Sequence, residues 1–131
     1  MNIPSDLKYT STDEWVKLDG DVATMGVTDY AQDQLSDVVF VEITLGAGDQ
    51  AKRNTTCVTL ESVKAAADVN CAVSGEVVEA NEDLAQSPEL VNTDPYGAAW
   101  MLKIKLSNPS ELDSMMRSEE HTSELQSRFG I

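Results

Sequence analysis

The chain has 131 residues, 41% of them hydrophobic, which suits a single domain with a modest core. It carries 9 basic and 23 acidic residues, for a net charge of −14. Such a charge repels phosphate backbones and anionic bilayers, so it argues against nucleic acid and membrane partners and favours basic patches on other proteins. No apolar run is long enough to cross a bilayer and the amino end has no signal-peptide pattern. We therefore expect a cytoplasmic monomer.

Strand-like runs alternate with turn signals in the first third of the chain. Asp19-Gly20-Asp21 is a turn signal between two β-prone runs. Thr28 or Asp29 offers a side-chain oxygen that can cap a helix, and the apolar, β-branched run after it is typical of a buried strand. The predicted elements are a hairpin of residues 15–18 and 22–27, a short helix over 30–35 and a strand over 38–43.

Two β-prone runs in the middle of the chain flank a single lysine. Residues 55–60 precede Lys64, and residues 69–73 follow it and end at Ser74-Gly75. This arrangement predicts a hairpin with Lys64 at its tip. A lysine at a tip stands clear of the domain, where a modifying enzyme can reach it, although an ordinary surface lysine would look the same.

The second half of the chain continues the pattern of short elements. Pro88 disfavours helix in the residue before it, so a helix starting near Asn81 should end there. Residues 100–106 alternate apolar and polar side chains, as a half-buried strand does. The predicted elements are a strand over 76–80, a short helix over 81–86, a loop over 90–97, a strand over 100–106 and a helix starting at 111. Many short strands with glycine-containing turns predict an all-β sandwich or barrel with small helices.

No residue pattern indicates a catalytic or metal site. Cys57 and Cys71 lie seven residues on either side of Lys64, and we expect both to be small core residues without a disulfide bond. There is no C-x-x-C motif, and His121 is the sole histidine, so a metal site has little support. A nucleophile–base pair is also missing. A hydrolase or nuclease therefore has no support in the sequence.

The stretch Glu61-Ser62-Val63-Lys64-Ala65 resembles the lipoylation motif of the glycine cleavage system H protein family. The resemblance extends over about residues 3 to 115 in the family's order. The other matching segments are residues 26–32, 37–42, 73–79, 87–92, 94–97 and 100–105.

The resemblance implies a mainly β fold, a flattened β-barrel sandwich of the lipoyl/biotinyl carrier type with a few short helices. It implies Lys64 as the cofactor-binding residue, with lipoate attached as lipoyl-lysine. The implied function is a shuttle in glycine catabolism and one-carbon metabolism, a carrier that is not itself an enzyme. It carries the aminomethyl group from glycine decarboxylase (P protein) to the aminomethyltransferase (T protein), and electrons to dihydrolipoyl dehydrogenase (L protein). Lipoate-attaching enzymes are further implied partners.

In the family, polar side chains near the amino end line a groove where the loaded arm rests. The resemblance carries this role to Glu14, less securely to Thr12, and in part to Asp68. The family usually has histidine just before the Glu-Trp pair, where this chain has Asp13. We therefore expect different hydrogen bonding at this point.

Other carriers and a different class of protein remain as alternatives. Biotin carriers favour methionine on both sides of the lysine, where this chain has Val63 and Ala65. Lipoyl domains of 2-oxo acid dehydrogenases have aspartate before the lysine and Ala/Pro-rich linkers, and this chain has neither. The third alternative is an acidic interaction module in which Lys64 stays unmodified.

Residues 117–127 resemble an in-frame translation of a common sequencing adapter. The family ends in a helix after residues 109–112, and here the tail interrupts it. We therefore predict a carrier domain over residues 1–116 and an artefactual tail over 117–131 that is disordered or weakly helical.

Overall fold

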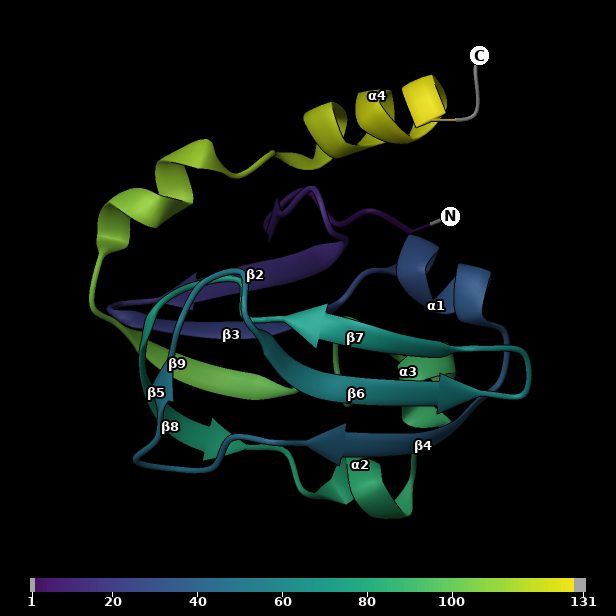
Figure 1. The fold of residues 1–131 in the computed structure, drawn as a ribbon. Helices are drawn as coiled ribbons and strands as arrows, with labels where there is room; N and C mark the ends of the chain where they lie inside the picture. Colours follow the sequence, from purple (N-terminus) through teal and green to yellow (C-terminus); the bar gives the residue numbers. More distant parts are fainter. Residues whose placement is uncertain (1, 129–131) are drawn as a thin grey trace.

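The computed structural model describes residues 2–128, and within them the strands form two antiparallel sheets that pack as a sandwich (Figure 1). The larger sheet has the order β1-β2-β3-β9-β8-β5, and the smaller one has the order β4-β6-β7. The strands are β1 (Lys8–Tyr9), β2 (Glu14–Asp19), β3 (Val22–Val27), β4 (Val38–Ile43), β5 (Gln50–Ala51), β6 (Thr56–Ser62), β7 (Ala66–Asn70), β8 (Gly75–Ala80) and β9 (Leu102–Leu106). The prediction of a mainly β sandwich with a few short helices is confirmed.

The predicted amino-terminal hairpin is present. β2 and β3 pair antiparallel, with Trp15 opposite Gly26. The close approach explains the glycine, because a Cβ at position 26 would lie 2.8 Å from Nε1 of Trp15. Helix α1 (Asp29–Leu35) follows, and the Thr28 hydroxyl accepts a hydrogen bond from the N–H of Ala31 at 3.2 Å, as the capping pattern predicts.

The central hairpin is formed by β6 and β7, and β4 pairs with the other edge of β6. β7 begins at Ala66, three residues earlier than the predicted start at Val69, and ends at Asn70. Alanine has little intrinsic strand preference, but Ala66 and Ala67 pair with Glu61 and Leu60 because the tight turn brings them into register. Tertiary pairing therefore overrides local propensity here.

The second half of the chain supplies β8, β9 and short helices. Helices α2 (Asp83–Gln86) and α3 (Leu90–Thr93) and the 3₁₀ helix η1 (Pro109–Ser114) complete it. The prediction of a loop over 90–97 is wrong for residues 90–93, because the side chain of Val91 is buried and anchors a turn of helix. The predicted short helix before Pro88 and the strand predicted over 76–80 are confirmed. The strand predicted over 100–106 is present from Leu102 to Leu106 and does not include residues 100 and 101.

The core lies between the two sheets and includes both cysteines. Met25 and Ile104 from the larger sheet and Val41 and Leu60 from the smaller one belong to a single buried cluster. Cys57 and Cys71 are buried in the same cluster as free thiols, which confirms the expectation of core residues without a disulfide bond.

The carboxyl-terminal tail, which is predicted to be disordered or weakly helical, contains a helix in the structure. Helix α4 (Ser118–Arg128) lies over β1 and the amino-terminal segment (Figure 1). His121 and Leu125, one helical turn apart, are buried against the domain. Residues 129–131 of the predicted tail lie outside the described residues, and the domain boundary at residue 116 stays a prediction. None of the helices within residues 2–128 has the length and hydrophobicity that a bilayer crossing requires.

Candidate functional site

Lys64 lies at the tip of the β6–β7 hairpin, as predicted, and Ser62 organises the turn around it. The Ser62 hydroxyl accepts hydrogen bonds from the N–H groups of Lys64 at 3.2 Å and Ala65 at 2.9 Å. The Ser62 N–H in turn donates to the carbonyl of Ala65 at 2.8 Å. These bonds satisfy the turn's polar groups locally, so the tip needs no side-chain burial to hold its shape.

The amine of Lys64 is exposed and reaches back to the end of α1. Its Nζ donates to the carbonyl oxygen of Gln34 at 3.1 Å. Gln34 lies in the last turn of α1, where backbone carbonyls are unpaired and the helix dipole is negative. The tip is also joined to the start of β4, because the N–H of Val63 donates to the carbonyl of Asp37 at 3.0 Å. The backbone of the tip is thus held while the lysine side chain stays accessible.

A groove of about 330 Å³ lies between α1 and the β6–β7 hairpin. Gln34, which contacts Lys64, lines this groove, so one part of the groove lies within reach of the lysine. The lining residues are Thr12, Asp13, Glu14, Val27, Tyr30, Ala31, Gln34, Leu35, Leu60, Ala67, Asp68, Val69 and Arg128.

Glu14 places a buried carboxylate in the groove. Only 3% of the residue is exposed, and its Oε1 accepts hydrogen bonds from the hydroxyls of Thr10 at 2.6 Å and Thr12 at 2.5 Å. Burial raises the pKa of Glu14, although these hydrogen bonds oppose the shift. Among the described residues, no cation forms an ion pair with Glu14. A buried carboxylate of this kind is stabilised by any positive group that enters the groove.

Asp13, at the position where the resemblance implies a histidine, is paired with helix α4. Its backbone has φ +71°, a left-handed conformation that aspartate tolerates better than most residues. Nη1 of Arg128 lies 3.0 Å from each carboxylate oxygen of Asp13, and Nη2 donates to the carbonyl of Ser11 at 2.9 Å. The guanidinium also lies 5.4 Å from the ring centroid of Tyr30. Arg128 therefore closes part of the groove wall.

The structure brings most of the predicted groove residues together. Thr12, Glu14 and Asp68 all line the groove. Glu14 and Thr12 are hydrogen bonded to each other, whereas Asp68 is exposed at its edge. Sequence reasoning missed Ser62, Thr10 and Arg128. Ser62 carried a signal, since serine before a tight turn often bonds nearby backbone groups. Arg128 carried none, because its role depends on where α4 packs.

The fold and this site define a class of protein: a small β sandwich that presents a lysine on a hairpin tip beside an acidic groove. Such a protein can offer an amine for acylation and a resting place for the acyl group. It presents no nucleophile–base pair among the residues described here.

Comparison with known proteins identifies the family. The family model for the glycine cleavage H-protein matches residues 7–128. The chain is 51% identical to the glycine cleavage system H protein of Halothermothrix orenii over 121 residues, covering 92% of this chain and 94% of that protein. It is 52% identical over 116 residues to the mitochondrial glycine cleavage system H protein of Flaveria pubescens, covering 88% of this chain and 76% of that one.

A solved structure agrees with both comparisons. The crystal structure of a glycine cleavage system H protein from Mycobacterium marinum matches with a TM-score of 0.82 at 29% identity, covering 98% of this chain and all of that chain. The chain belongs to the glycine cleavage H-protein family.

Proposed function

We propose that this chain is the lipoyl-bearing carrier of a glycine cleavage system, with Lys64 as the attachment residue. The observation that carries the proposal is the exposed amine on a turn whose backbone is held by Ser62 and Asp37. The chain presents the amine and does not catalyse. Family membership supports the same conclusion.

The residues around Lys64 fit an acyl group. Ala65, Ala66 and Ala67 follow the lysine and leave space for a transferase to approach. Acylation removes the charge that holds the amine at the Gln34 carbonyl, so the modified side chain is freer to leave α1. Lipoate bound as an amide supplies a cyclic disulfide that is reduced when it takes up a carbon fragment. The chain's own contribution is to hold the attachment point outside the domain.

The carrier would then work with three enzymes and one modifying system. By this proposal the partners are glycine decarboxylase, the aminomethyltransferase, dihydrolipoyl dehydrogenase and a lipoate-attaching enzyme, and the monomer acts in the cytoplasm. A tethered group meets each enzyme at a raised effective concentration, so no free product needs to diffuse between them. The net charge of −14 favours docking on basic surfaces.

We assign the groove beside the hairpin as the resting place of the loaded arm. An aminomethyl group carries an amine that is positively charged at neutral pH. The buried Glu14 carboxylate, with Thr12 beside it, offers the negative charge that such an amine needs. In the same groove the Arg128 guanidinium is already neutralised by Asp13 and Glu124.

Substitution of the lysine tests the attachment residue directly. Lys64→Arg should keep the fold, because the side chain is exposed, and should abolish both lipoyl addition and glycine cleavage, because arginine is not acylated by lipoate ligases. The measurements are intact mass after growth on lipoate and glycine cleavage in a reconstituted system. Lys52→Arg and Lys103→Arg are the controls and should still gain one lipoyl mass. A lipoyl mass on the Lys64→Arg chain would refute the assignment, and a biotinyl mass on the parent chain would favour a biotin carrier.

A further inference from the structure

The exposed apolar side chains are concentrated around the lysine tip. Five large apolar residues are exposed among those the structure describes, and three of them, Val39, Phe40 and Val63, lie at the lysine end of the three-stranded sheet. Val63 is 70% exposed and Val39 is 54% exposed. The remaining two, Leu18 and Val78, lie on the other sheet. Single exposed apolar residues are ordinary, but a group at one position usually marks a binding surface.

A β-bulge produces this group. In the pairing of β4 with β6, the register shifts between Val38 and Phe40, so Val39 is an extra residue. Val38 is buried, whereas the next two side chains are both exposed. A regular strand would have turned one of them into the core. Val63 joins the group through the hydrogen bond from its N–H to the carbonyl of Asp37. We call Val39, Phe40 and Val63 the tip patch.

Carboxylates lie beside the tip patch, in the β4–β6 pairing and along the chain. Glu61 lies directly opposite Phe40 in the β4–β6 pair, and Asp37 precedes β4. Asp33 on α1 and Glu42 on β4 are also exposed. Lys64 is the sole base of the hairpin tip, and acylation neutralises it. An apolar centre with an acidic rim is complementary to a protein surface that has an apolar depression and a basic rim.

The negative charge of the chain argues against two other occupants of the tip patch. A second copy of this chain would bring the same acidic rim against itself, and each copy has a net charge of −14. An anionic bilayer would be repelled in the same way.

We propose that the tip patch is the surface on which the lipoate-attaching enzyme recognises this chain, an inference that rests on the proposed function. The length of the lipoylated lysine side chain distinguishes this enzyme from the other partners. A lipoylated lysine extends roughly 12–15 Å from the backbone, so the later enzymes receive the group at a distance from the tip. The attaching enzyme must instead bring its reactive centre to the bare Nζ of Lys64, so it contacts the residues next to the lysine.

Two matched double variants test the apolar part of the proposal. Val39→Ser/Val63→Ser removes two members of the tip patch, and Leu18→Ser/Val78→Ser removes the two exposed apolar residues of the other sheet. Val39 and Val78 are well matched, since both are exposed and lie at β-bulges. The assay follows lipoyl mass gain on the intact chain with a lipoate–protein ligase, ATP and lipoate. The tip-patch variant should lose about tenfold in kcat/KM, mainly through KM, and the control should stay within about twofold.

The acidic rim is tested by its salt dependence. Asp37→Asn/Glu61→Gln and Asp19→Asn/Glu76→Gln change the net charge equally, but only the first pair adjoins the tip patch. The rim variant should slow acylation at low ionic strength and flatten its dependence on salt, while the distant pair should keep the parent's slope.

The outcomes separate this inference from the proposed function. If the parent chain gains no lipoyl mass at Lys64, the proposed function fails. If the parent is lipoylated and Val39→Ser/Val63→Ser and Asp37→Asn/Glu61→Gln both react at the parent's rate, the tip patch is not the recognition surface. The inference is also overturned if acylation is unchanged but turnover with glycine decarboxylase falls, since another partner then occupies the patch.

Discussion

The hairpin tip and helix α4 are held by opposite means. At the tip, Lys64 is exposed and the turn depends on short-range hydrogen bonds from Ser62. In α4, His121 and Leu125 are buried, and the helix depends on contact with β1, which is more than a hundred residues earlier in the chain. The tip therefore keeps its shape without a partner, whereas α4 has its shape because the domain is beneath it.

The contact between α4 and the domain leaves buried polar atoms without hydrogen-bond partners. The His121 ring stacks on Tyr9, with centroids 4.7 Å apart and an interplanar angle of 7°. Both of its ring nitrogens are buried without a hydrogen-bond partner. Leaving such groups unpaired costs free energy, so the helix is held by shape and apolar contact more than by polar matching. This difference makes α4 the more vulnerable of the two regions.

The largest expected effect follows from removing the apolar anchor of α4. Leu125→Ala should weaken the docking of α4 on the domain by about 2 kcal/mol, because a buried leucine side chain is lost. The total cost is limited, since the helix can undock while the sandwich stays folded. Amide exchange should therefore rise within residues 118–128 and stay unchanged in β6 and β7.

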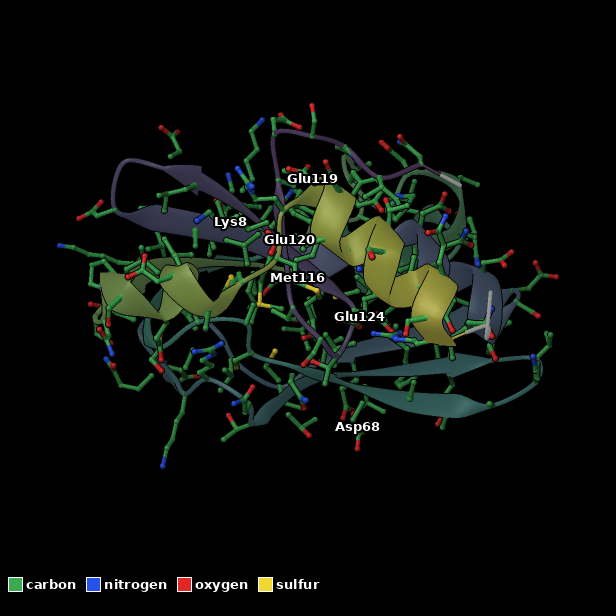
Figure 2. The ribbon with its side chains drawn as sticks, turned by 90° about the horizontal axis from the view of Figure 1, so that it is seen from above. Lys8, Asp68, Met116, Glu119, Glu120 and Glu124 are labelled. Atoms are coloured by element: carbon green, nitrogen blue, oxygen red, sulfur yellow. The ribbon has the colours of Figure 1, made fainter. Side chains whose placement is uncertain are left out.

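The matched control for this prediction is Glu119→Ala on the exposed side of α4 (Figure 2). It should leave the exchange pattern as it is. Equal loss of protection in the hairpin of Lys64 would show that the two regions unfold together and that α4 does not undock on its own.

Acidification should also release α4, by a smaller effect. Burial lowers the pKa of His121, opposed by Asp13 and Glu124 and assisted by Arg128. The undocked side chain binds a proton below about pH 6.5, whereas the docked one binds it only at lower pH. The stability that neutral His121 gives to the docked helix is therefore fully present above about pH 6.5 and is lost as the pH falls below it. Thermal melts from pH 7 to 5 should show this loss.

His121→Phe separates the imidazole from other acid effects. Phenylalanine keeps a flat ring over Tyr9 and does not ionise. The difference between the two melting profiles should grow as the pH falls. Parallel profiles would mean that the carboxylates, and not His121, control the acid response.

The smallest expected effect lies at the tip. Ser62→Ala removes the acceptor for two turn N–H groups and should cost about 1 kcal/mol of local stability. Amide exchange of Lys64 and Ala65 should rise, and the melting temperature should change little. Ser107→Ala, at an exposed position just after β9, is the control. Unchanged exchange at the tip would mean that the β6–β7 pairing alone holds the turn.

Prediction from sequence succeeded where the signal was local. The Asp19-Gly20-Asp21 turn and the Thr28 cap act over a few residues, and both are found in the structure. The errors have a common cause. Ala66 and Ala67 are strand residues because Glu61 and Leu60 pair with them, and residues 90–93 are helical because Val91 is buried. Neither contact has a signature within its own segment.

The sequence by itself determined the β class, the hairpin tip and the lysine at its end, because turn chemistry and hydrophobic patterning operate between near neighbours. Only the tertiary structure decided the groove. It brings Glu14 from the first hairpin against α1 and the lysine hairpin, and it adds Arg128 from the far end of the chain. Its contacts cross the whole sequence, so their geometry depends on how the two sheets and α4 pack together.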